Sequence, residues 1–156
     1  MPHRKLLRRR EDGAPRFITF SCDRRLPLLS PPESAAIFAR ELRDARDRLG
    51  FALYAWVVMP EHVHLLLMPS PATSAADVLA SLKARVAKSA LGLSDVRRLA
   101  ADPSRFWQRG GGFDRNVRDE FEFEEDAAYI HRNPVRRGLV ACPTDWEWSS
   151  ARWYGG

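Results

Sequence analysis

Two histidines one residue apart, His62 and His64, interrupt an apolar run that extends from Trp56 to Leu67. The aliphatic and β-branched residues of this run predict a β-strand, in which alternate side chains point to the same face. His62 and His64 therefore share one face, and two imidazoles side by side on a rigid strand can bind one cation. The alternative is a pair of buried histidines that hydrogen-bond to their neighbours.

A tyrosine and an asparagine four residues apart, Tyr129 and Asn133, lie in the second half of a predicted helix. Acidic residues from Asp119 to Asp126 occupy its first half, where the positive end of the helix dipole favours them. Pro134 disfavours helical geometry at Asn133, so the helix is expected to end there or within a residue. Positions i and i+4 share a helix face, which brings a phenol and an amide oxygen together. The alternatives are a half-buried packing role for Tyr129 and a C-terminal capping role for Asn133.

The elements that would position these groups follow from local patterns. Alternating β-forming residues predict strands, apolar residues at helical spacing predict helices, and proline and glycine mark the breaks. In chain order we expect a strand over 16–21, a helix over 30–49 ending at Gly50, strands over 51–59 and 62–68 paired as a hairpin, a helix from Thr73 or Ser74 to about Leu91, an aromatic strand or loop over 105–109, a flexible turn over 110–112, and the acidic helix.

Composition limits the class of protein. The chain has 156 residues, 45% of them hydrophobic, a formal net charge of +5 and a pI near 9.8, with arginine carrying most of the positive charge. An anionic partner is expected, nucleic acid before membrane. The sequence has no long apolar segment and no signal-peptide pattern, so we expect a cytoplasmic protein. Cys22 and Cys142 have no ligand-like spacing and predict neither a disulfide framework nor a zinc site.

The length fits a single domain. We expect a basic N-terminal tail over residues 1–15, one domain over 16–150 and a short C-terminal tail over 151–156. The arginines of the first tail could follow a phosphate backbone, or they could simply be solvated.

The ordered set of motifs resembles the single-tyrosine HUH transposases, in the branch of the REP-associated tyrosine transposases. The stretch from Met59 to Leu67, with His62 and His64, is similar to their His-hydrophobic-His motif, and the stretch from Tyr129 to Val140 is similar to their tyrosine helix. Residues 106–109, 117–120 and 145–150 also match. The resemblance implies an α+β fold, with an antiparallel β-sheet of about four or five strands and flanking helices in the ferredoxin-like HUH endonuclease arrangement.

The resemblance also implies a chemistry. Such an enzyme is a metal-dependent single-stranded DNA endonuclease and transposase that cleaves and rejoins DNA at hairpin or REP-like palindromic sites. Tyr129 would form a covalent 5′-phosphotyrosine and leave a free 3′-hydroxyl. A phenol has an unperturbed pKa of about 10, so its attack at neutral pH needs help. His62, His64 and the side-chain oxygen of Asn133 would bind Mg²⁺ or Mn²⁺, with Mn²⁺ favoured by the nitrogen donors.

Binding of single-stranded DNA requires basic side chains for phosphates and aromatic faces for bases. The candidates are Arg4, Arg8, Arg9, Arg10, Arg24, Arg25, Arg109, Arg115, Arg136 and Arg137 for phosphates, and Trp107, Trp153 and Tyr154 for bases. For each arginine the alternative is a solvated surface charge, and for the tryptophans it is packing in the core. Glu61 and His131 are candidates for a supporting or proton-transfer role.

Two other functions fit the same residues. A metal-dependent phosphodiesterase with a water nucleophile would use the histidines but would not need Tyr129. A domesticated protein would keep the fold and bind single-stranded or hairpin DNA without cutting it. We expect neither a nucleotide cofactor nor a membrane partner, and we favour a monomer over a dimer.

Overall fold

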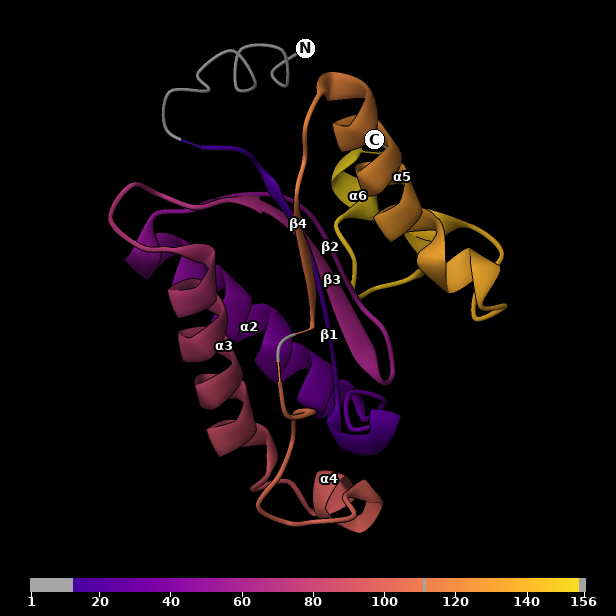
Figure 1. The fold of residues 1–156 in the computed structure, drawn as a ribbon. Coiled ribbons are helices and arrows are strands. Elements are labelled where there is room, and N and C mark those ends of the chain that lie inside the picture. The colour runs from indigo at the N-terminus through magenta and orange to yellow at the C-terminus, as the bar shows by residue number, and fades with distance from the viewer. Residues whose placement is uncertain (1–12, 111, 155–156) are drawn as a thin grey trace.

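Four antiparallel strands form one sheet in the computed structural model, which describes residues 13–110 and 112–154 (Figure 1). The strands lie in the order β2-β3-β1-β4. Their bounds are β1, Arg16–Ser21; β2, Ala52–Val58; β3, His62–Met68; and β4, Phe113–Asn116. The predicted α+β fold with an antiparallel sheet of four or five strands and flanking helices is confirmed.

Helices cover both faces of this sheet, and Figure 1 shows α2 and α3 on one side and α5 on the other. Gly50, with φ of 72°, ends α2, and the Ser74 hydroxyl accepts a hydrogen bond from the Asp77 amide to begin α3. The helices are α2, Pro32–Leu49; α3, Ala75–Ala90; α4, Ser94–Leu99; α5, Glu120–Arg136; and α6, Ala151–Tyr154, with short 3-10 turns η2, Asp23–Arg25, and η3, Pro143–Asp145. No helix in the described ranges is both long and apolar enough to cross a membrane.

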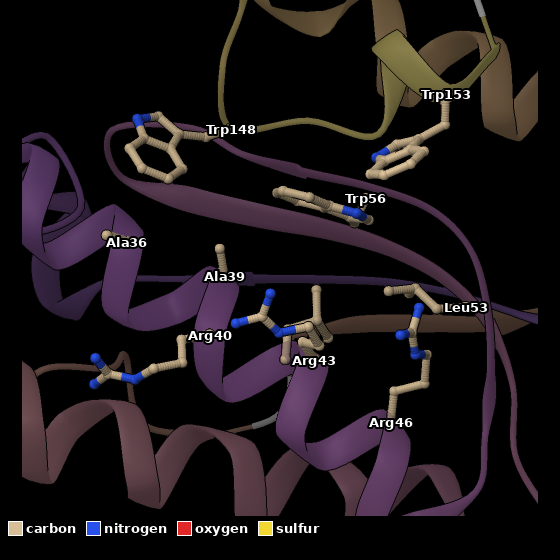
Figure 2. A pocket seen from close by; sticks show the side chains of 10 residues that line it. Ala36, Ala39, Arg40, Arg43, Arg46, Leu53, Trp56, Trp148 and Trp153 are labelled. Carbon is tan, nitrogen blue, oxygen red and sulfur yellow. The ribbon is translucent and has the colours of Figure 1, made fainter.

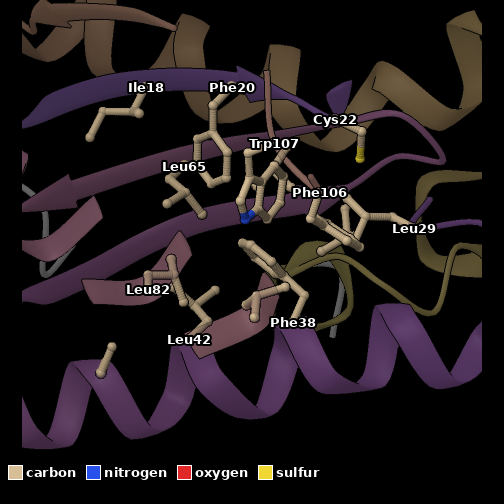
Figure 3. Packing of buried hydrophobic residues seen from close by; sticks show 14 of the residues in the cluster. Ile18, Phe20, Cys22, Leu29, Phe38, Leu42, Leu65, Leu82, Phe106 and Trp107 are labelled. Atoms are coloured by element: carbon tan, nitrogen blue, oxygen red, sulfur yellow. The ribbon is translucent and has the colours of Figure 1, made fainter. Parts of the chain in front are cut away.

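Alternation along the strands gives the sheet two different faces. On the α2/α3 face, Ile18, Phe20, Val63 and Leu65 join a large buried apolar cluster with side chains of both helices (Figure 3). On the α5 face, a smaller cluster contains Phe17, Val57 and Leu66 of the sheet and Phe123, Ala127 and Ile130 of α5. Strand β3 supplies both clusters, because its successive side chains point to opposite faces.

Trp107 belongs to the larger cluster, which corrects the expectation that it offers a stacking face for DNA bases. Its ring packs edge-on against Phe20 and Phe38, its exposed fraction is 8%, and its indole N–H donates to the backbone oxygen of Lys83 (Figure 3). A buried indole has no free face for a base. The predicted aromatic segment is a loop with one isolated bridge, between Trp107 and Cys22.

The acidic helix differs from its prediction at the C-terminal end. Helix α5 passes through Pro134 and continues to Arg136, and Arg137 is its C-cap. Proline removes a single backbone donor, and Asn133 and Pro134 are both buried, so packing of this last turn outweighs the lost hydrogen bond. Asn133 is therefore inside the helix and is not its cap.

Strand β4 and helix α4 were not expected from the sequence. Strand β4 pairs with β1, and the Arg16 side chain binds Asp114 and Asn116 across the pair. Just before β4, a Cβ atom on Gly112 would lie 1.8 Å from the backbone oxygen of Thr19, so only glycine fits at this position. This close approach places the start of β4 beside Thr19.

Candidate active site

His62 and His64 share one face of the sheet, as the alternation in β3 predicted, and this is the face that α5 covers. His62 and His64 are both buried, with exposed fractions of 6% and 5%. Their rings meet nearly edge-on at a centroid distance of 4.7 Å, and the two Nε2 atoms are 3.1 Å apart. The two histidines are therefore buried, and their Nε2 atoms face each other.

The other ring nitrogens are held by neighbouring oxygens. The Nδ1 atom of His62 lies 2.9 Å from Glu61 Oε1, and the Nδ1 atom of His64 lies 2.7 Å from Thr19 Oγ1. A carboxylate can only accept, so Glu61 fixes the tautomer of His62 with its proton on Nδ1 and its lone pair on Nε2. Such outer partners orient imidazoles that bind metals.

Burial keeps both imidazoles neutral at physiological pH. Burial, together with the positive charges of nearby groups, lowers the pKa of His64 to about 3. Burial also lowers the pKa of His62, although the hydrogen bond to Glu61 opposes this. For Glu61, burial alone would raise the pKa, but hydrogen bonds from Arg137 and His62 lower it below its usual range. The site thus contains two neutral imidazoles and one carboxylate.

Tyr129 of α5 packs against the histidine pair. Its ring lies edge-on to the rings of His64 and Phe17, at centroid distances of 5.4 Å and 6.1 Å. The guanidinium of Arg136, which is also on α5, lies 5.0 Å from the centroid of the Tyr129 ring. The exposed fraction of Tyr129 is 37%, so the phenol is open to a ligand. Helix α5 thus carries a phenol to the edge of the imidazole pair.

Asn133, one turn beyond Tyr129, is buried with an exposed fraction of 5%. Within the described residues its side chain makes no hydrogen bond or ion pair. It lines a pocket of 340 Å³, which we call the catalytic pocket after the role proposed for it below. The lining residues are Thr19, Arg25, His62, His64, Tyr129, Asn133, Arg136 and Arg137. Strands β1 and β3, turn η2 and the last turns of α5 therefore converge on one cavity.

This donor set fits a divalent cation. If the Thr19 hydroxyl accepts a hydrogen bond from His64 Nδ1, as Glu61 does from His62 Nδ1, both Nε2 lone pairs face each other at 3.1 Å, an arrangement that a cation between them relieves. Among the residues that the structure describes, no three His, Cys, Asp or Glu side chains form a metal-binding group. A third protein ligand would therefore be of another type, and the amide of Asn133 lines the same pocket.

The chain matches the family model described as IS200-like transposase over residues 18–133. This chain belongs to the IS200-like transposase family. The match covers most of the chain and includes the histidine pair, Tyr129 and Asn133, so the family expected from the sequence motifs is confirmed.

One relative found by sequence and two solved structures resemble this IS200-like transposase. A REP-associated tyrosine transposase of Escherichia coli K12 is 29% identical over 106 residues, which is 67% of this chain, and the chain spans only 56% of that relative's length. A solved structure of a REP-associated tyrosine transposase bound to a REP hairpin superposes with a TM-score of 0.71 at 23% identity, over 89% of this chain and 77% of the other. A crystal structure assigned as a transposase from Deinococcus radiodurans R1 gives a TM-score of 0.55 at 24% identity, over 74% and 87%.

The arginines proposed for phosphate binding in this transposase occupy different places. Arg25, Arg136 and Arg137 line the catalytic pocket, and Arg25 and Arg137 also contact Glu61. Arg24 is exposed beside Arg25 in η2, and Arg109 is exposed but does not line the catalytic pocket. Arg4, Arg8, Arg9 and Arg10 lie outside the described residues.

Arg115 lies in a second pocket, on the other side of Tyr129. This cavity of 500 Å³ is lined by Phe17, Thr19, His64, Phe113, Arg115, Glu125, Asp126 and Tyr129. Arg115 forms ion pairs with Glu122 and Asp126 and lies 4.9 Å from the Phe17 ring centroid. Because two carboxylates already neutralise it, Arg115 offers less charge to a phosphate than the arginines of the catalytic pocket.

Sequence reasoning missed one residue of the site and gave another no firm role. Thr19 was read only as part of the first strand, and its position opposite His64 depends on the β1/β3 register, which local patterns do not reveal. His131, a candidate supporting group, does not line the catalytic pocket. Its Nε2 lies 2.8 Å from Ser150 Oγ, and its ring contacts Tyr154, so it secures the C-terminal segment.

Proposed function

We propose that this IS200-like transposase cleaves and rejoins single-stranded DNA through a covalent bond between Tyr129 and a 5′-phosphate. The observation that carries the proposal is the 5.4 Å packing of the Tyr129 ring against His64, whose Nε2 faces that of His62 in the same pocket. A water-dependent phosphodiesterase would not need a half-exposed phenol at this position.

The tyrosine would act as the nucleophile. Its phenolic oxygen forms a bond to the scissile phosphorus, the bond from phosphorus to the 3′-oxygen breaks, and the leaving oxygen takes a proton to become a 3′-hydroxyl. The phenol gives up its own proton to solvent. Attack by a 3′-hydroxyl on the phosphotyrosine reverses the step and rejoins strands without an energy source, because one phosphodiester replaces another.

His62, His64 and the amide oxygen of Asn133 are the residues that would hold Mg²⁺ or Mn²⁺. When bound, such an ion supplies positive charge to the non-bridging oxygens of the phosphate. Glu61 and Thr19 hold the two imidazoles in place through their Nδ1 atoms, so that both Nε2 atoms stay directed into the pocket.

Arg25, Arg136 and Arg137 would bind DNA phosphates at the pocket mouth, where all three are exposed. Guanidinium groups suit this role because they donate two hydrogen bonds to one phosphate. The solved relative bound to a REP hairpin supports hairpin DNA as the substrate class. We therefore propose single-stranded DNA that folds into hairpins at palindromic sites as the partner of this chain.

A denaturing gel tests the proposal. The wild-type protein, with Mn²⁺ and labelled single-stranded hairpins from palindromes near its own gene, should give a slower covalent protein–DNA band. Tyr129→Phe should give no such band yet bind the DNA with nearly unchanged affinity, because it removes only the attacking oxygen. His62→Ala should lose the band and metal binding together.

The other outcomes identify the competing functions. Nicking by both wild type and Tyr129→Phe, without a covalent band, would replace the tyrosine mechanism with hydrolysis by water. Tight binding with neither nick nor band, in Mg²⁺ and in Mn²⁺, would replace it with a non-cleaving hairpin-binding role.

A further inference from the structure

A groove of 420 Å³ on the opposite face of the sheet contains three arginines and three tryptophans. It lies between α2 and the β2 edge, and Figure 2 shows the indoles along one side and the arginine-bearing helix along the other. We call it the Arg–Trp groove, and the residues that define it are Arg40, Arg43, Arg46, Trp56, Trp148 and Trp153. None of these six lines the catalytic pocket.

The arginines of the Arg–Trp groove have little internal compensation. Within the described residues, Arg40 and Arg43 form no ion pair or side-chain hydrogen bond, and Arg46 has one long contact of 3.6 Å with Asp47 on the surface. Asp44 and Asp47, which are exposed on the same helix, do not line the groove. Positions three apart on a helix rise by about 4.5 Å and differ by about 60° around the axis, so the three arginines follow one another along the side of α2 that lines the groove.

The tryptophans are held on firm backbone. The Val58 amide donates to the Trp148 backbone oxygen at 2.8 Å, and the Trp56 amide donates to the Ser150 hydroxyl at 2.9 Å, which joins residues 148–150 to the edge of β2. Trp153 nevertheless has an exposed fraction of 84%. An indole this exposed on an anchored segment has little of its surface packed, and it is available to a partner.

We propose that the Arg–Trp groove is a second binding site for single-stranded nucleic acid, separate from the catalytic pocket. Guanidinium groups bind phosphates, and indole faces stack on unpaired bases, so the arginines and tryptophans of the groove match the two parts of a single strand. A concave groove suits a strand better than the flat surface of a membrane. The site would hold a part of the DNA that is distant from the reacting phosphate. The inference rests on the proposed function in one respect, the choice of DNA as the polyanion that binds.

Binding in EDTA separates this inference from the chemistry, because no cleavage is needed. The probe is a fluorescent oligothymidylate of about 12 nucleotides, which spans the site sizes usual for single strands. The test variant carries Arg40→Gln, Arg43→Gln and Arg46→Gln. The matched control carries Arg85→Gln, Arg97→Gln and Arg98→Gln, which removes the same charge from exposed residues of α3 and α4.

The test variant should bind the oligonucleotide about tenfold more weakly than the control, or weaker still. The slope of log K against log salt concentration should become shallower by about 2, because each lost phosphate contact removes about 0.7 from it. Trp153→Ala should weaken binding about tenfold without changing that slope, because stacking releases no counterions. A duplex of equal length should be far less sensitive to Trp153→Ala.

Equal affinity and equal salt slope for the test and control variants would overturn the proposal. Arginine-dependent binding to phosphatidylserine vesicles, with unchanged DNA affinity, would also overturn it in favour of a lipid surface. All substituted residues are exposed, and thermal unfolding should show that each variant is as stable as the wild type. A wild type that forms no tyrosine adduct with any DNA would refute the proposed function but leave this binding test valid.

Discussion

The two faces of the sheet are built from the same strands but carry different kinds of side chain. Under α2 and α3, the side chains of β1 and β3 are hydrocarbon and close a large apolar cluster. Under α5, the same strands present Thr19, His62 and His64 to a pocket. The difference shows that strand alternation can separate the residues that close the larger apolar cluster from those that line the proposed active site.

The α5 face contains buried polar groups, which are costly unless they are paired. Here the pairing is local: Glu61 and Thr19 bind the outer nitrogens of the histidines, and the inner nitrogens face each other. The inner pair is the part that a ligand would complete. Of two neighbouring residues of β3, the one on the α5 face should therefore affect activity more than stability when it is substituted. The one on the α2/α3 face should affect stability more than activity.

The largest expected effect is that of His64→Ala on activity. It removes one of the two facing Nε2 atoms, so the covalent adduct on a denaturing gel should fall below detection. The free energy of unfolding should change by only about 1 kcal/mol, because the apolar cluster on the other face is untouched. Denaturant unfolding measures the second quantity. An adduct at the wild-type rate would show that His64 is not part of the catalytic machinery.

The adjacent change, Leu65→Ala, should do the reverse. Leu65 is fully buried in the larger cluster, so its truncation should cost about 2–5 kcal/mol of unfolding free energy. The rate of adduct formation per folded molecule should stay near that of the wild type at low temperature. If that rate fell together with stability, the two faces would be coupled and the separation would be wrong.

Glu61→Gln should have an intermediate effect, confined to the α5 face. Glutamine can still accept from His62 but loses the charge that also binds Arg25 and Arg137. Metal affinity should drop by about 10–100-fold, the usual cost of losing an outer partner. Calorimetric titration with Mn²⁺ measures this, with Glu147→Gln on the exposed surface as the control. An unchanged affinity would exclude a role for Glu61 in orienting His62.

The smallest expected effect compares the helix caps of the two faces. Asp119 and Ser74 each accept a hydrogen bond from the amide three residues on, Asp119 at the start of α5 and Ser74 at the start of α3. Asp119→Ala and Ser74→Ala should each cost about 1 kcal/mol. Only Asp119→Ala should slow adduct formation, by about two- to threefold, because α5 carries Tyr129. The comparison fails if both variants slow it equally.

Local patterns were sufficient for the groups that one element carries. Alternation in β3 predicted the shared face of His62 and His64, and helical spacing predicted that of Tyr129 and Asn133. The strands over 16–21 and 62–68 and the helix ending at Gly50 also follow the prediction closely. These features depend on residues close in sequence, where periodicity and caps are informative.

Features that depend on tertiary packing could not be predicted in this way. The opposition of Thr19 and His64 depends on the β1/β3 register, and the burial of Trp107 depends on Phe38 of α2. Pro134 was expected to end α5, but the burial of the last turn overrides that local preference. Strand β4 has only four residues, mostly polar and exposed, so it shows no clear alternation of apolar side chains.

The segment that follows α5 also affects whether another strand can add to the outer edge of the sheet. An outer strand exposes unpaired amides and carbonyls that invite another strand, and this is a common route to aggregation. In β2, the Trp56 and Val58 backbones are already engaged by residues 148–150, and the Trp146 indole donates to Val58 oxygen. The chain thus covers the end of its own outer strand that contains residues 56–58, so a second molecule cannot extend the sheet along these residues without displacing this segment.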